Sequence, residues 1–123
     1  YPEIGREPTE HLFMELLQAK DRVVRKMTAG LKLCMVFTDL DALRNATEND
    51  TYRRLMTEIP GIHIYLDKEV ASVMMARKMF LEPGVWPLMV LMDGKRTGLY
   101  GCHGYHVGSV DLVLKLVDCI NLQ

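Results

Sequence analysis

The sequence has no Cys-x-x-Cys pair, and its three cysteines, Cys34, Cys102 and Cys119, lie far apart along the chain. An odd and sparse set of cysteines argues against a disulfide framework. Their spacing also matches no zinc-type ligand pattern. We therefore expect three small buried hydrophobic side chains, with no bound metal.

The sequence also lacks a strong charge of either sign and a long apolar run. Its 15 basic and 16 acidic residues give a net charge of −1, too weak a field to hold nucleic acid or an anionic membrane surface. No apolar stretch approaches the ~18 residues that span a bilayer. The first residues show no basic and apolar leader pattern. We expect no membrane insertion and favour a cytoplasmic location. An extracytoplasmic location, reached after removal of a signal peptide, is the alternative.

What the sequence does have is the length and apolar content of one domain. Of the 123 residues, 49% are hydrophobic and 25% charged, which is ordinary for a globular chain with a single core. Hydrophobic periodicity and turn residues predict alternating helices and strands, while the polar stretch 42–49 favours neither. We expect helices over residues 9–29, 50–58, 67–80 and 107–120, and strands over residues 31–37, 62–66, 87–92 and 97–102.

This order of elements predicts an α/β fold. Each strand–helix–strand unit implies parallel pairing, whereas Asp93-Gly94 between two strands is typical of an antiparallel hairpin. We therefore expect a single three-layer domain over residues 1–123, with a four-stranded mixed sheet and helices on both faces. Residues 1–8 would form an N-terminal arm, 9–29 a leading helix and 31–120 the core unit.

The element order and one local motif resemble the thioredoxin superfamily. The motif is Pro83-Gly84-Val85-Trp86-Pro87, followed by an apolar strand, Asp93-Gly94 and a second strand that ends in glycine. The resemblance covers about residues 31–120 and implies a thioredoxin-like fold, in which Pro87 takes the place of the family's cis proline. Gly104 matches the family's glycine before the last helix.

The departure from that family lies at its active site. Thioredoxins carry a Trp-Cys-x-x-Cys turn after the first strand of this unit, whereas residues 38–45 contain no cysteine. A redox thioredoxin needs a low-pKa thiolate there and a resolving partner. Because Asp39 and Asp41 cannot attack a disulfide, the sequence predicts a member of the superfamily without thiol–disulfide chemistry.

A narrower resemblance is to hydrogenase-maturation chaperones of the thioredoxin-like type, which also lack the cysteine pair. The matching pieces are Val36-Phe37-Thr38-Asp39, Asn49-Asp50, Ile59-Pro60-Gly61 and Gly104-Tyr105-His106. Such proteins are thought to hold a hydrogenase subunit before its export. The resemblance therefore implies a protein client.

The leading hypothesis for function is a non-enzymatic, protein-binding or chaperone-like module without a cofactor. Its candidate contact surface combines the turn residues Asp39, Leu40, Asp41, Ala42 and Leu43 with Trp86 and Pro87. A tryptophan before such a proline can anchor a partner peptide, and the backbone there can pair with an extended segment. We expect the partner to be a protein client or a larger assembly, and the oligomeric state stays open.

Two alternatives remain open at this point. One is a one-cysteine thiol redox protein that uses Cys102 with His103 or His106 as helper, since a Cys–His pair can form a nucleophile. The other is a structural domain cut from a larger chain. Asn45 and Asn49 each begin an Asn-x-Thr pattern, which suits either glycosylation or a helix start, and we favour the helix start.

Overall fold

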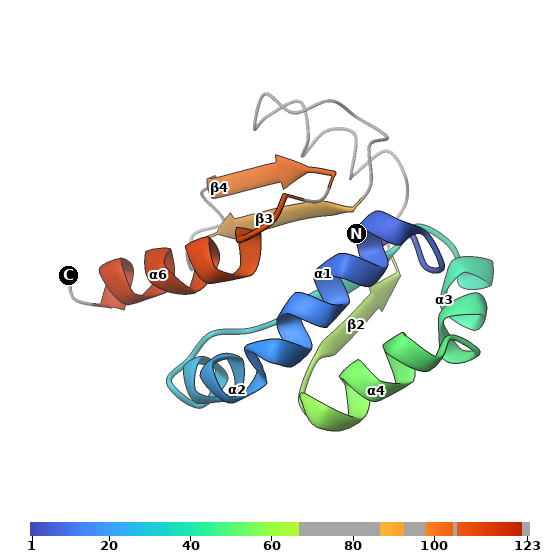
Figure 1. The fold of residues 1–123 in the computed structure, drawn as a ribbon, viewed down its shortest axis with the longest axis horizontal. Helices are drawn as coiled ribbons and strands as arrows, with labels where there is room; N and C mark the ends of the chain where they lie inside the picture. The colour runs from blue at the N-terminus through green and yellow to red at the C-terminus, as the bar shows by residue number, and fades with distance from the viewer. Residues whose placement is uncertain (67–86, 93–97, 105, 122–123) are drawn as a thin grey trace.

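The computed structural model describes residues 1–66, 87–92, 98–104 and 106–121 (Figure 1). The predicted helix over residues 67–80, Trp86 and the Asp93-Gly94 turn lie outside these described residues. Along the chain the elements are α1 (Glu7–Gln18), α2 (Lys20–Thr28), β1 (Cys34–Phe37), α3 (Leu40–Thr47), α4 (Asp50–Glu58), β2 (His63–Leu66), β3 (Leu88–Met92), β4 (Gly98–His103) and α6 (Ser109–Asn121).

The helices follow the sequence signals closely, with one exception near the start. The helix expected over residues 9–29 is two helices, because the backbone at Ala19 leaves helical geometry with φ −99° and ψ 15°. Residues 42–49, which favoured neither pattern, belong mostly to α3. Helix α4 has the predicted bounds, and the Asn49 side chain caps it by accepting a hydrogen bond from the Tyr52 backbone nitrogen at 2.9 Å.

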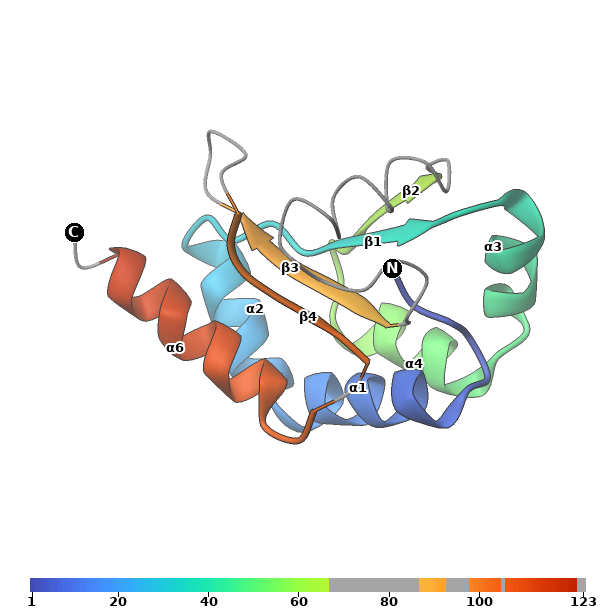
Figure 2. The ribbon, with the colours of Figure 1, turned by 90° about the horizontal axis from the view of Figure 1, so that it is seen from above.

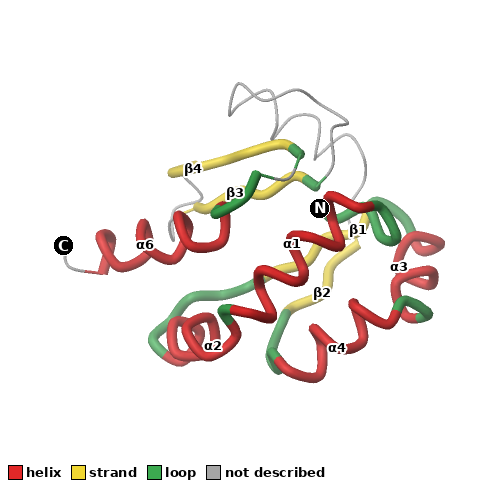
Figure 3. Tube along the Cα trace, viewed as in Figure 1, coloured by secondary structure: helices red, strands yellow, loops and turns green. Residues whose placement is uncertain are grey.

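The expected four-stranded sheet is wrong: the described strands form two separate sheets of two strands each (Figure 3). Strands β1 and β2 pair in parallel, and β3 pairs with β4 in the predicted antiparallel hairpin. A single sheet would need β3 to pair with β1 along its other edge. The backbone groups of Leu88 on that edge pair instead with Tyr1, through nitrogen–oxygen distances of 2.9 and 3.0 Å. Figure 2 shows the N-terminus between β1 and β3.

The main core lies on one face of the β1–β2 pair. Figure 2 shows α1, α2 and α4 on that side of the two strands, and α6 adds two side chains from the end of the chain. Alternation along β1 directs Met35 and Phe37 into the core while Cys34 is exposed. The buried members of this core are Phe13, Leu17, Val23, Met35, Phe37, Ala46, Tyr52, Leu55, Ile59, Ile62, Val110 and Leu114.

Candidate binding surface

The carboxyl ends of the two parallel strands meet at one edge of the molecule. Phe37, the last residue of β1, stands in register with Leu66, the last residue of β2. Helix α3 follows β1 after a link of two residues, Thr38 and Asp39, so its first turn lies just beyond the carboxyl end of β1. Ligand sites of α/β proteins commonly lie outside the carboxyl ends of parallel strands. The predicted turn over residues 39–43 therefore occupies a position suited to binding.

The residues of that turn divide into two groups. Asp39 has an extended backbone and caps α3, its Oδ1 accepting a hydrogen bond from the Ala42 backbone nitrogen at 2.7 Å. Leu40 and Asp41 are exposed, whereas Ala42 and Leu43 are partly buried against the main core. Asp39, Leu40 and Asp41 are therefore open to solvent, and the two following residues pack α3 against the core.

Two further apolar side chains lie at the same edge. Tyr65 and Leu66 are 52% and 53% exposed, and Leu40 is 48% exposed. The sequence predicts the strand over residues 62–66 but carries no signal for this exposure, which depends on packing. Neighbouring residues of a strand point to opposite faces, so the apolar surface wraps around the edge. We name Asp39, Leu40, Asp41, Tyr65 and Leu66 the strand-end surface.

Pro87 is described but does not line this surface. It is buried, and its carbonyl accepts a hydrogen bond from the Gly104 backbone nitrogen at 2.9 Å. In Figures 1 and 2, residues 1–6 lie between α3 and the start of β3. No hydrogen bond or ion pair within the described part of the chain joins Pro87 to the turn over residues 39–43. The arrangement of Trp86 falls outside the described residues.

The expectation of three buried cysteines holds for Cys102 alone, because Cys34 and Cys119 are exposed. The Cys102 thiol lies 4.0 Å from the Gly104 carbonyl, to which it donates. Burial raises the pKa of the Tyr100 hydroxyl, and its contact with Cys102 adds to that shift. A reactive thiol needs a partly exposed, electropositive setting, which these neighbours of Cys102 do not supply. His106 is exposed, and the His103 side chain lies outside the described residues.

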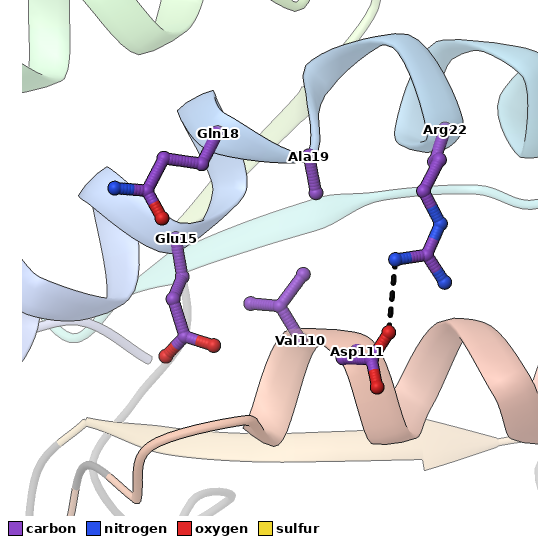
Figure 4. A pocket seen from close by; sticks show the side chains of 6 residues that line it. All are labelled: Glu15, Gln18, Ala19, Arg22, Val110 and Asp111. Atoms are coloured by element: carbon purple, nitrogen blue, oxygen red, sulfur yellow. Dashed lines mark hydrogen bonds and ion pairs between the residues drawn. The ribbon is translucent and has the colours of Figure 1, made fainter.

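A pocket of about 250 Å³ lies between the α1–α2 junction and α6 (Figure 4). The Arg22 Nη1 atom donates to Asp111 Oδ1 across it at 2.9 Å, and Glu15 Oε1 accepts from the Gly108 backbone nitrogen at 3.1 Å. These charged groups are engaged with one another or with backbone. The pocket therefore joins the helices through polar contacts and presents no unpaired guanidinium for a ligand.

Within the described residues, no group of three or more His, Cys, Asp or Glu side chains is arranged to hold a metal ion. Across those same residues, no helix combines the length and apolar character needed to cross a membrane.

Comparisons of the chain with protein-family models, curated proteins and solved structures find no match, so the thioredoxin resemblance stays a prediction from the sequence.

Proposed function

We propose that this protein is a non-enzymatic, chaperone-like binding module that holds a segment of a client protein on the strand-end surface. The observation that carries the proposal is the exposure of three large apolar side chains on the last two residues of β2 and the first residue of α3: Leu40, Tyr65 and Leu66 are each about half exposed. Single exposed apolar residues are normal on a protein surface, whereas several of them at one edge favour an interaction site.

The chemistry of the surface indicates the kind of client segment. Tyr65 offers an apolar ring with a hydroxyl, a combination enriched in protein interfaces. Asp39 and Asp41 add exposed carboxylates beside the apolar side chains. A client segment with apolar residues next to lysine or arginine complements both features. The sequence resemblance names one client to try first, the precursor of a hydrogenase subunit.

Site-specific photo-crosslinking tests this proposal. A photoreactive residue is placed at position 40, at position 65, or at the control position 112, where Leu112 on α6 is also partly exposed at 43%. The probes are cell extract and the purified hydrogenase-subunit precursor. We expect client adducts from positions 40 and 65 and none from position 112.

A pair of matched variants completes the test. Leu40→Asp adds a charge to the strand-end surface and should remove the adducts formed at position 65, whereas Leu112→Asp on α6 should leave them. Equal adducts from all three positions would contradict the proposal. Reduction of insulin disulfides by the purified protein, persisting after removal of contaminating thiols, would contradict its non-enzymatic part.

A further inference from the structure

Cys34 and His63 are neighbours across the two parallel strands. The register of β1 and β2 pairs Cys34 directly with His63. Paired residues in adjacent strands lie about 4.8 Å apart and direct their side chains to the same face. Both residues are exposed. An imidazole and a thiol therefore stand side by side on the surface of the β1–β2 pair.

The face that carries the two side chains is the one opposite the main core. Met35 and Phe37 direct their side chains to the core, and both are buried. His63 also stacks on Tyr65, with ring centroids 6.3 Å apart and an angle of 19° between the planes. The stacking limits the freedom of the imidazole and keeps it on the face that it shares with Cys34.

The other two cysteines lack this arrangement. Cys102 is buried, as described above. Cys119 is exposed on α6, and Lys115, one helical turn earlier, already pairs through its Nζ atom with Asp111 Oδ2 at 3.0 Å. The chain therefore offers one exposed thiol beside a histidine and a second exposed thiol that serves as its internal control.

We propose that Cys34 is the site at which this protein forms a mixed disulfide with a small-molecule disulfide of the glutathione type, and that His63 promotes the reaction. The two proposals can fail separately, because this one is tested at Cys34 and His63 and the client proposal at positions 40 and 65, although His63 stacks on Tyr65 of the strand-end surface.

The chemistry is ordinary thiol–disulfide exchange. The Cys34 thiol gives its proton to the imidazole of His63 or to water, and the thiolate attacks one sulfur of the small disulfide. A sulfur–sulfur bond forms to Cys34, the original bond breaks, and the leaving thiolate takes up a proton. The imidazole of His63 is the neighbouring acceptor for that proton, and this is the part that His63 plays in the reaction. A free thiol reverses the reaction.

The test measures the rate of mixed-disulfide formation at each cysteine of the intact protein, with glutathione disulfide as the probe and mass spectrometry as the readout. We expect Cys34 to react at least about threefold faster than Cys119, because Cys34 has an imidazole beside it that can take up the thiol proton. Cys102 should stay unmodified. Reaction of Cys119 at the same rate as Cys34, or faster, would overturn the proposal.

A set of variants isolates the part played by His63. His63→Gln, which keeps a polar side chain but cannot take up the thiol proton, should reduce the Cys34 rate to that of Cys119. His11→Gln, at an exposed histidine on α1, should change neither. The Cys119 rate within each variant reports any general loosening of the fold. An unchanged Cys34 rate in His63→Gln would remove His63 from the proposal.

Discussion

The backbone of Tyr1 pairs with the backbone of Leu88, a residue 87 positions away, through two hydrogen bonds of 2.9 and 3.0 Å. A reciprocal pair of this kind is one rung of an antiparallel ladder. It occupies the edge of β3 that faces away from β4. The pairing fills the first position of that edge, at Leu88, where a strand of the other described sheet would otherwise have to pair.

The same edge of β3 should show sharply different hydrogen exchange at two neighbouring positions. The Leu88 amide donates to the Tyr1 carbonyl, whereas Val90, two residues along the same edge, has no backbone partner there among the described residues. We expect the Leu88 amide to exchange about fivefold more slowly than that of Val90, since one hydrogen bond contributes roughly 1 kcal/mol. Deletion of Tyr1 should remove the difference. Equal rates in the intact chain would show that the pairing does not persist in solution.

The main core should depend strongly on Leu55, which is fully buried in α4. Truncation to alanine removes apolar contacts and leaves a cavity, so Leu55→Ala should lower the free energy of unfolding by about 2 to 5 kcal/mol. Leu112→Ala, at a partly exposed position on α6, should cost less than about 1 kcal/mol. Urea unfolding of both variants gives the comparison. Losses of similar size would place Leu55 outside the core.

The sequence predicts local structure well where a chemical signal marks the boundary. Helix α4 begins after Asn49, a good capping residue, and Pro60-Gly61 follows its end. The break between α1 and α2 at Ala19 was not predicted, because neither glycine nor proline stands there. The periodicity of residues 9–29 continues across the break and therefore indicates one helix.

The wrong sheet prediction has a physical cause of another kind. Element order indicates which strands can pair, but the partner of Leu88 on its outer edge is the first residue of the chain. No pattern at Tyr1 predicts a strand contact, since a single rung leaves no periodic signal. The sequence predicts only part of the strand-end surface for a similar reason. Asp39 and Leu40 belong to a turn that the sequence indicates, while the exposure of Tyr65 and Leu66 depends on packing.

The cap of α4 should contribute measurably to stability. The Asn49 Oδ1 atom accepts from the Tyr52 nitrogen, and its Nδ2 atom donates to Glu10 Oε1 at 3.0 Å. We expect Asn49→Ala to cost about 1 kcal/mol or somewhat more. Asn49→Ser keeps a capping oxygen and loses only the bond to Glu10, so it should cost less. Thermal or urea unfolding distinguishes the two, and an alanine variant as stable as the parent would contradict the capping role.

The contact of α2 with α4 should make stability depend on pH in the acid range. The Lys20 Nζ atom donates to Glu58 Oε1 at 2.8 Å, and the Arg54 Nε atom donates to the other carboxylate oxygen. The hydrogen bond from Lys20 is the largest cause that lowers the pKa of Glu58 below its ordinary value of 4.5, and Arg54 adds to it. The unfolded chain therefore binds a proton at this group at a higher pH than the folded chain does.

It follows that the stabilisation from Glu58 is fully present above about pH 4.5 and is lost as the pH falls through the lowered pKa. Glu58→Gln should be less stable than the parent near neutral pH, and the difference should shrink as urea unfolding is repeated at lower pH. Glu48→Gln, at an exposed position without an ion pair among the described residues, provides the matched control. If the free energies of unfolding of Glu58→Gln and the parent differ by the same amount from neutral to acid pH, the carboxylate charge contributes nothing to the contact with Lys20.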